Sequence, residues 1–465
     1  MMTEILKWLL VVAACGGLVF ATFVTIIYLG HKLKEDEEKE TSEEAENNAD
    51  EAKAPESKME VVKPEPVKPA EEETSDPDEI DMSAIAELAE EPAPKEEEET
   101  AGIAFSTGNG ELKLSEFDRG LIDFLEDEGY RNENYMVSPA SLRAVIGLAV
   151  AGADSDTKSE LLKAAGFSNE AEMNMWYNAM VNAPDTSADD FAFKMLNSAW
   201  HNSKLKGELS PDYKDYIKNH YGAEAQDIAA DEITDAVNNW VNEGTDGLIP
   251  TIANDLSEKD LVLVNTLYLK SSWIRKFEKE ATGEDDFMSY DGCCIKKEFM
   301  DKTDHYKFYE DPKSKILVMS LSGDVEMACI LGDTEGFQGK LSKASDEKVH
   351  VMLPKFETET SFEKKELVHF LQSRGAKSAF APEADFSAMS SDSGFFVSDI
   401  IQKTKIITDE NGVEASAATG MAMVGAALDI DENPPKEFFA TKPFKYYIMT
   451  SGNVKEVLFY GQIVE

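Results

Sequence analysis

Hydrophobic and polar residues alternate with two different periods between residues 105 and 465. Near residue 120 the apolar positions fall three or four residues apart, which predicts an amphipathic helix with one buried face. The positions on this face are Phe117, Leu121, Phe124 and Leu125. The stretch from Leu142 to Val150, which is apolar apart from Arg143, follows the pair Ser138-Pro139, a common start of a helix, and predicts a second, buried helix.

Three later segments have the patterns of β-strands. Residues 260–273 contain a continuous apolar run that is typical of a buried strand. Residues 349–360 and 454–465 instead alternate between apolar and polar positions, as half-buried strands do. Because helices gather early and strands late, the pattern predicts an α+β fold with large antiparallel or mixed sheets.

The longest apolar run begins at Trp8, ends at Gly30 and contains no charged residue. Its 23 residues are enough for a tilted transmembrane helix, so we expect a single-pass anchor within residues 1–31. Basic residues flank both ends of the run, and the positive-inside rule therefore gives no firm orientation. Two alternatives stay open: a cleaved signal peptide, whose apolar core is normally shorter, and a lipid anchor on Cys15, which follows a lipobox-like Val-Ala-Ala.

The next segment, residues 32–104, is acidic and rich in proline. Between residues 35 and 100 there are 27 Asp or Glu, 6 Lys and 7 Pro, and no aromatic residue. Such a segment buries too little apolar surface to offset its ordering entropy, and charge repulsion extends it. We therefore expect a disordered linker at 32–104 and a globular domain at 105–465.

Composition and motifs exclude several classes of function. The formal net charge is −46, which is unfavourable for contact with phosphates, and we expect no nucleic-acid partner. The sequence has no GxSxG, HExxH, P-loop or EF-hand pattern, and its histidines lack metal-ligand spacing. The sequence therefore predicts a protein that is not an enzyme and that holds neither a metal nor a cofactor.

Six segments of the globular region resemble motifs of one protein family, and they occur in that family's order. The segments are NYMVSPASLRAVIGLAVAGADSDTKSELLKAAGF (134–167), NSAWHNSKLKGELSPDYKDYIKNHYGAEAQDI (197–228), DAVNNWVNEGTDGLIPTI (235–252), LVLVNTLYLKSSWIRKFEKEAT (261–282), KFETETSFEKKELVHFLQSRGAKSAFAPEADFSAMS (355–390) and ENGVEASAAT (410–419). Over nearly the whole region, the chain is similar to the serpins.

The resemblance implies a fold and a mechanism. The fold would be the serpin fold, with three β-sheets, eight or nine helices and an exposed reactive-centre loop at about 410–435. In the mechanism, a protease attacks the loop and forms an acyl-enzyme. The cleaved loop then inserts into the central sheet as a new strand and distorts the protease before deacylation.

A loop that inserts as a strand needs a side-chain period of two. One face of the segment is small or apolar: Val413, Ala415, Ala417, Thr419, Met421 and Met423. The other face is polar at first and small thereafter: Glu414, Ser416, Ala418, Gly420, Ala422 and Val424. No proline lies between Glu410 and Leu428, so every backbone N–H can join a ladder. The predicted hinge residues are Glu410, Gly412, Val413, Glu414, Ala415, Ser416, Ala417, Ala418 and Thr419.

The spacing of inhibitory serpins, counted from Glu410, implies a reactive bond between Ala426 and Ala427. A small residue before the bond suits the shallow specificity pocket of an elastase-like serine protease and suits trypsin-like enzymes poorly. A shift in register towards Leu428 would instead favour a chymotrypsin-like target, and a papain-like cysteine protease is a further alternative.

The resemblance also assigns residues of the sheet that must open. Lys355 matches the residue that pairs with the hinge glutamate, and Trp273 matches the tryptophan beneath the loop's entry point. The matches to the polar cluster under the sheet centre are Ser138, Ser141, Asn265 and Gln402. Serpins usually have His in place of Gln402, which forms hydrogen bonds but does not titrate near neutral pH.

Together these features predict a suicide-substrate inhibitor of serine endopeptidases, with elastase-like targets. We expect a monomer anchored in a membrane through residues 8–30, with the serpin domain outside the cytoplasm. A secreted protein and one lipid-anchored through Cys15 are the alternatives for its location. The alternative for its function is a non-inhibitory serpin that acts as a tethered binding module.

Overall fold

The computed structural model describes residues 112, 114–204, 207–390, 394–413, 434–452 and 455–465, all within a unit that spans 94–465. The predicted anchor and the predicted acidic linker lie outside the described residues. Within the described part, no helix is both long and apolar enough to cross a membrane.

The predicted helices begin at serine residues that cap their first turns. α2 (Glu116–Asp127) has a capping box in which Ser115 and Asp118 each accept a hydrogen bond from the other's backbone N–H. α3 (Pro139–Gly152) follows Ser138, and 13 of its residues are buried. The other α-helices are α4 (Ser155–Ala165), α5 (Glu170–Val181), α6 (Pro211–Tyr221), α7 (Ile233–Gly244), α8 (Phe337–Leu341) and α9 (Glu366–Ser373). Three short 3-10 helices are η1 (Tyr130–Asn132), η2 (Lys279–Ala281) and η3 (Ser378–Phe380).

A six-stranded sheet forms one layer of the domain. In spatial order its strands are β10 (Phe356–Phe362), β11 (Asp399–Thr408), β12 (Gly412–Val413), β4 (Leu261–Ser272), β2 (Ala192–Asn202) and β3 (Glu224–Ile228). β4 and β11 are parallel and pair directly with each other at one end, whereas the short β12 lies between them at the other end.

The remaining strands form one nine-stranded sheet. In spatial order they are β1 (Tyr135–Val137), β15 (Val457–Ile463), β14 (Phe444–Thr450), β8 (Val325–Gly332), β7 (Ser314–Leu321), β6 (Cys294–Glu310), β9 (Ser345–Pro354) and β13 (Lys436–Phe439), with β5 (Gly283–Met288) on β6. Hydrogen bonds thus join the described strands into two sheets instead of the expected three. The reason is β6, a strand of 17 residues that pairs with β7 near its end and with β9 along its middle.

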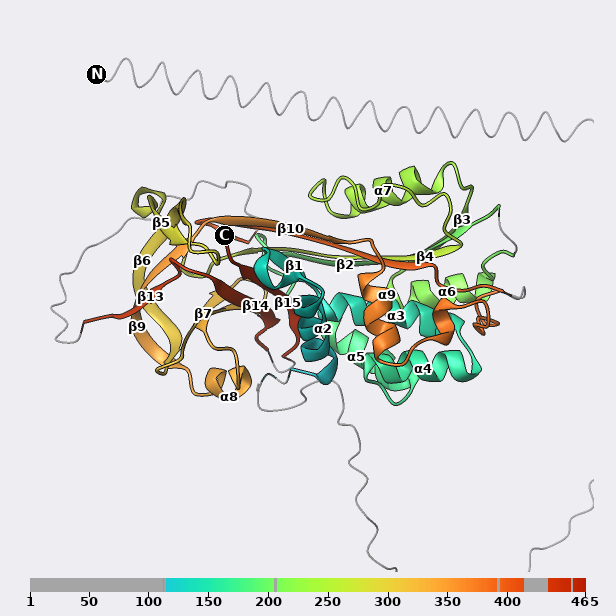
Figure 1. The fold of residues 1–465 in the computed structure, drawn as a ribbon, viewed down its shortest axis with the longest axis horizontal. Coiled ribbons are helices and arrows are strands. Elements are labelled where there is room, and N and C mark those ends of the chain that lie inside the picture. The colour runs from blue at the N-terminus through green and yellow to red at the C-terminus, as the bar shows by residue number, and fades with distance from the viewer. Residues whose placement is uncertain (1–111, 113, 205–206, 391–393, 414–433, 453–454) are drawn as a thin grey trace, which may run out of the picture. The chain divides into compact units, whose positions relative to one another are not determined.

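Helices cover both faces of the six-stranded sheet. Figure 1 shows α7 on one face, and α3, α6 and α9 on the opposite face. Because β4 is covered on both faces, its alternate residues enter two different apolar clusters: Leu263 and Leu267 lie in the main core, and Val262 and Val264 lie in the smaller core beside α7. This double burial accounts for the continuous apolar run in the sequence.

Two of the predicted strands differ from the pattern-based expectation. Residues 349–360 form parts of two strands, because the chain leaves β9 after Pro354 and enters β10 of the other sheet at Phe356. The C-terminal strand β15 is buried at all seven positions instead of being half-buried. β15 lies between β14 and β1 and is packed within the main core, so its polar Gln462 is buried as well.

Candidate functional site

The two central strands of the six-stranded sheet separate along their length. β4 and β11 pair in parallel from Val262 opposite Asp399 to Asn265 opposite Gln402. Beyond this point no ladder pairing joins them within the described residues, although the hydroxyl of Thr266 donates to the Lys403 carbonyl oxygen at 2.9 Å. The far end of the separation is occupied by the two residues of β12.

β12 is the first part of the predicted loop, and it already pairs with both central strands. Val413 lies opposite Ser271 of β4 and opposite Thr408 of β11, and both pairings are antiparallel. Val413 is buried in the main core, as its apolar, β-branched side chain favours. Two of the predicted hinge residues therefore lie between the strands that the mechanism requires to part.

Gly412 is required by a close approach of two backbones. A Cβ atom at this position would collide with the carbonyl oxygen of Ser271 and crowd the Cα of Ser272. Only glycine, which has no side chain, lets β12 lie this close to the end of β4 without moving one of the two strands.

Trp273 holds the chain that leads into β12. Its indole N–H donates to the carbonyl oxygen of Asp409 at 2.8 Å, and its backbone N–H donates to the carbonyl oxygen of Asn411 at 2.8 Å. The backbone N–H of Phe277 donates to the carbonyl oxygen of Glu410 at 3.0 Å. The segment after β4 thus binds three consecutive carbonyl groups of the hinge.

The side chain of Glu410 faces the residue that the resemblance assigned to it. Lys355 Nζ lies 3.4 Å from Glu410 Oε1, and the hydroxyl of Thr282 donates to the same oxygen at 2.9 Å. Burial acts to raise the pKa of Glu410, but the hydrogen bonds and the Lys355 cation outweigh it and lower that pKa below its usual value. Glu410 is therefore an ionised, anchored residue at the base of the loop.

The structure brings the four predicted polar residues together where β4 and β11 begin to separate. Gln402 accepts from the backbone N–H of Ser138 at 2.9 Å, and its amide donates to Asn265 Oδ1 at 3.0 Å and to the Ser138 carbonyl oxygen at 3.1 Å. The hydroxyl of Ser141 also donates to Asn265 Oδ1. All four residues are completely buried.

Sequence reasoning missed several residues of this site. Asn197 of β2 extends the polar cluster, because the Asn265 amide donates to its Oδ1 at 2.6 Å. Thr282 and the carbonyl of Asp409 complete the contacts of Glu410 and Trp273. No spacing or motif marks Asn197 or Thr282 in the sequence, since each reaches the site only through the pairing of distant segments.

Among the described residues, three histidines contact carboxylates and not nucleophilic side chains. An example is the pair His201–Asp227 at 2.7 Å, and no histidine in this part of the chain hydrogen-bonds a serine, threonine or cysteine side chain. No group of metal-ligating residues occurs among them either. The predicted reactive bond at Ala426 and Ala427, and the hinge residues from Glu414 to Thr419, lie outside the described residues.

Comparison with known proteins decides the family. The model of the family described as Serpin (serine protease inhibitor) matches residues 114–465. The chain belongs to the serpin family. The description of this family is that of protease inhibitors, which are not themselves catalysts, and at the level of the family this agrees with the sequence-based expectation.

Three relatives illustrate the range within this family. Leukocyte elastase inhibitor from Sus scrofa is 27% identical over 363 residues, which cover 71% of this chain and 92% of that protein. The native structure of tengpin, a thermophilic serpin, has a TM-score of 0.66 at 24% identity and covers 77% of this serpin and 97% of tengpin. Human thyroxine-binding globulin has a TM-score of 0.67 at 19% identity, with 75% and 96% coverage. The likeness to the two solved structures is one of fold.

Proposed function

We propose that this serpin inhibits serine endopeptidases by the suicide-substrate mechanism, with cleavage between Ala426 and Ala427 and elastase-like targets. The observation that carries the proposal is the position of β12, whose Gly412 and Val413 pair with both β4 and β11 at the open end of the sheet. Insertion of the loop then continues a strand that has already begun. The likeness to leukocyte elastase inhibitor supports an elastase-like target.

The register of β12 predicts where each loop residue would lie after insertion. Continued along β4, it places Ala415 opposite Leu269, Ala417 opposite Leu267 and Thr419 opposite Asn265. Leu267 and Leu269 face the main core, so small and apolar loop residues would meet apolar partners. The hydroxyl of Thr419 would reach the buried polar cluster, where it can find hydrogen-bond partners.

The opposite face of the loop fits the outer side of the sheet. In the same register Glu414 lies opposite Lys270, a half-buried residue of β4, and this pairing of opposite charges is favourable. On β11 the register places Ala415 beside Ile406 and Thr419 beside Gln402, which again matches buried positions. A shift of one residue would direct Glu414 into the core, so the pattern supports a single register.

The test is a reaction of the full chain with pancreatic elastase, followed by denaturing electrophoresis and mass spectrometry of the released peptide. We expect a complex that survives SDS and a peptide that begins at Ala427. Trypsin serves as the control protease, because the proposed bond offers its acidic pocket no cation. Complete cleavage by elastase, chymotrypsin and papain without any stable complex would contradict the inhibitory function.

A non-inhibitory binding role is the second candidate, since one solved structure of the same fold is a thyroxine-binding globulin. A heat scan of intact and loop-cleaved protein separates the two candidates. Insertion converts a kinetically held state into a more stable one, so the inhibitor gains thermal stability on cleavage. Equal melting temperatures would favour the binding role.

For the location, we propose a membrane anchor at residues 8–30, followed by an extended acidic linker that holds the serpin domain outside the cytoplasm. The uncharged length of the run supports this arrangement. Fractionation of cells that produce the full chain, followed by carbonate extraction and protease treatment of intact cells, tests it. Release of the domain into the medium would instead indicate a cleaved signal peptide.

A further inference from the structure

The connection from β11 to β12 contains an Asn-Gly pair, Asn411-Gly412. An Asn-Gly pair can deamidate without an enzyme when the backbone nitrogen of the glycine attacks the side-chain amide of the asparagine. Glycine has no Cβ, so its nitrogen is less hindered than that of any other residue. The chain contains a second such pair, Asn109-Gly110.

The carboxylate of Asp409 contacts both groups that take part in this reaction. Its Oδ1 accepts from the backbone N–H of Gly412, with 3.3 Å between oxygen and nitrogen, and its Oδ2 accepts from the side-chain amide of Asn411 at 3.4 Å. Oδ1 also accepts from the backbone N–H of Asn411 at 2.7 Å, which holds the carboxylate in the turn. A carboxylate in this place can take the proton from the attacking nitrogen and pass it to the leaving nitrogen.

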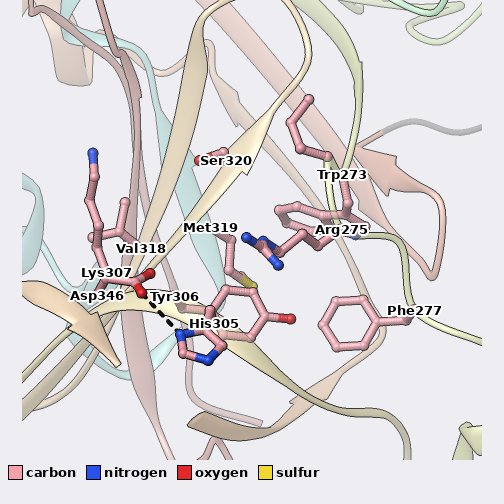
Figure 2. A pocket seen from close by; sticks show the side chains of 11 residues that line it. Trp273, Arg275, Phe277, His305, Tyr306, Lys307, Val318, Met319, Ser320 and Asp346 are labelled. Atoms are coloured by element: carbon pink, nitrogen blue, oxygen red, sulfur yellow. Dashed lines mark hydrogen bonds and ion pairs between the residues drawn. The ribbon is translucent and has the colours of Figure 1, made fainter. Parts of the chain in front are cut away.

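The backbone of the pair is anchored, whereas the side chain of Asn411 is loosely held. The backbone N–H of Trp273, a residue that also lines the pocket in Figure 2, donates to the Asn411 carbonyl oxygen at 2.8 Å. In the described part of the chain, the side-chain amide of Asn411 makes one hydrogen bond, the long contact to Asp409. Because Asn411 is only half-buried, this amide can turn towards the Gly412 nitrogen, and water can reach it.

We propose that Asn411 is a site of spontaneous deamidation, which Asp409 promotes. The Gly412 nitrogen forms a bond to Asn411 Cγ and gives its proton to the Asp409 carboxylate. The bond between Cγ and Nδ2 then breaks, Nδ2 leaves as ammonia with the proton from Asp409, and a succinimide ring remains. One water molecule opens this ring and yields either aspartate or isoaspartate at position 411.

The isoaspartate product does not fit the hinge, because it adds one carbon atom to the main chain just before Gly412. There is no space for a shift at Gly412, since even a Cβ atom there would collide with the carbonyl oxygen of Ser271. The chain must therefore give up either the hydrogen bond from Trp273 or the register of β12 on β4.

Both products also change the charge of the hinge. Each places a new carboxylate next to Glu410, and among the described residues Lys355 is the one cation within ion-pair distance of Glu410. Displacement of β12 would slow insertion of the loop, so aged protein would be cleaved as a substrate. This last step rests on the proposed inhibitory function, whereas the reaction at Asn411 does not.

The test follows deamidation of the full chain near neutral pH by tandem mass spectrometry, with an isoaspartyl methyltransferase to label isoaspartate. We expect Asn411 in the folded protein to react at least as fast as in a synthetic peptide of residues 404–418. Asp409→Asn keeps the shape of the side chain but removes the base, and it should slow the reaction at Asn411 by about 100-fold. Asn109 is the control within the same chain, and its rate should not change.

Two results would overturn the site. One is a slower reaction at Asn411 in the folded protein than in the peptide. The other is an unchanged or faster reaction in Asp409→Asn, which would mean that the carboxylate only restrains the turn. Circular dichroism checks the fold of the variant, and Asp409→Ser, whose hydroxyl can still accept from the turn, repeats the test if the first variant does not fold.

The second arm mixes fresh and aged protein with elastase. The yield of SDS-resistant complex should fall in step with the isoaspartate content. Asn411→Gln would have to close a larger ring, so its own yield should stay constant during the same incubation. A full yield from completely converted protein refutes the effect on the hinge. Absence of any complex with fresh protein contradicts the proposed function alone, because the mass-spectrometric arm needs no protease.

Discussion

The indole N–H of Trp273 donates a hydrogen bond to the carbonyl oxygen of Asp409, with 2.8 Å between nitrogen and oxygen. This contact joins the end of β4 to the end of β11 at the open end of the sheet. In the proposed mechanism, insertion of the loop would lengthen β12 between these strands, while the residues just before β12 stay bound to Trp273. The hinge is thereby fixed at one point, and in the proposed mechanism the residues after Val413 would enter the sheet beyond it.

Val413→Arg should convert the inhibitor into a substrate. Val413 is 2% exposed and lies between β4 and β11, so an arginine would have to bury an unpaired cation there. Insertion of the loop would slow, so the protease would complete deacylation before the loop had inserted. We expect elastase to cleave the variant without forming an SDS-resistant complex, whereas Val413→Thr keeps the complex. A normal yield of complex from the arginine variant would refute the role of β12.

Lys355→Gln should loosen the hinge without unfolding the domain. The variant removes the cation that lies 3.4 Å from Glu410 but leaves the hydrogen bond from Thr282. Because Lys355 is partly exposed, we expect a loss of only about 0.5–1 kcal/mol in unfolding free energy.

The loss caused by Lys355→Gln should depend on pH. The pKa of Glu410 is lowered in the folded protein, so its stabilising effect is present above the usual carboxyl pKa and is lost as pH falls through the lowered value. Urea midpoints of the two proteins should therefore differ at pH 7 and converge at a pH acidic enough to protonate Glu410 in the folded protein. A constant difference at both pH values would indicate that the ion pair does not contribute.

Gln402→Ala should destabilise the protein by about 2–4 kcal/mol. The substitution leaves the buried backbone N–H of Ser138 without the partner it has in Gln402, removes one of the two hydrogen bonds to Asn265 Oδ1, and creates a cavity. Gln226→Ala on the edge strand β3 is the matched control and should cost little. Thermal unfolding measures both, and similar shifts for the two variants would argue against the polar cluster.

The buried cluster around Arg143 predicts a second pH effect. Arg143 Nη2 contacts Asp118 Oδ1 at 3.0 Å and Glu456 Oε2 at 3.3 Å, and all three side chains are buried. Burial raises the pKa of Glu456 to about 7, since a single cation does not compensate two buried carboxylates. Because the pKa of Glu456 is higher in the folded than in the unfolded protein, folding is accompanied by the uptake of a proton between about pH 4.5 and pH 7.

Glu456→Gln should remove this pH dependence. Stability due to the protonated Glu456 is fully present below its unfolded pKa and is lost as pH rises through the folded value near 7. The unmodified protein should therefore lose stability relative to the variant between pH 4.5 and pH 8, by an amount on the order of 2–3 kcal/mol. Urea titrations across this range give the difference, and parallel curves would show that Glu456 does not change its protonation.

The sequence by itself was enough to predict those helices and strands whose burial produces a regular pattern of apolar residues. The amphipathic period around Phe117 predicted the helix α2, and the continuous apolar run predicted the strand β4. In both cases the burial of the element sets the spacing of its apolar residues. The two-faced pattern that starts at Val413 likewise follows from the sequence, since a strand must alternate wherever it is placed. The family motifs then assigned Lys355, Trp273 and the polar cluster.

Only the tertiary structure decided how distant segments meet. Nothing local marks Thr282 as a partner of Glu410, or Asn197 as part of the polar cluster, because each contact depends on chain pairings more than 60 residues apart. The division of 349–360 between two sheets depends equally on where the neighbouring strands lie. Hydrogen-bond register between remote strands is a property of the assembled sheet, and the pattern along one strand does not contain it.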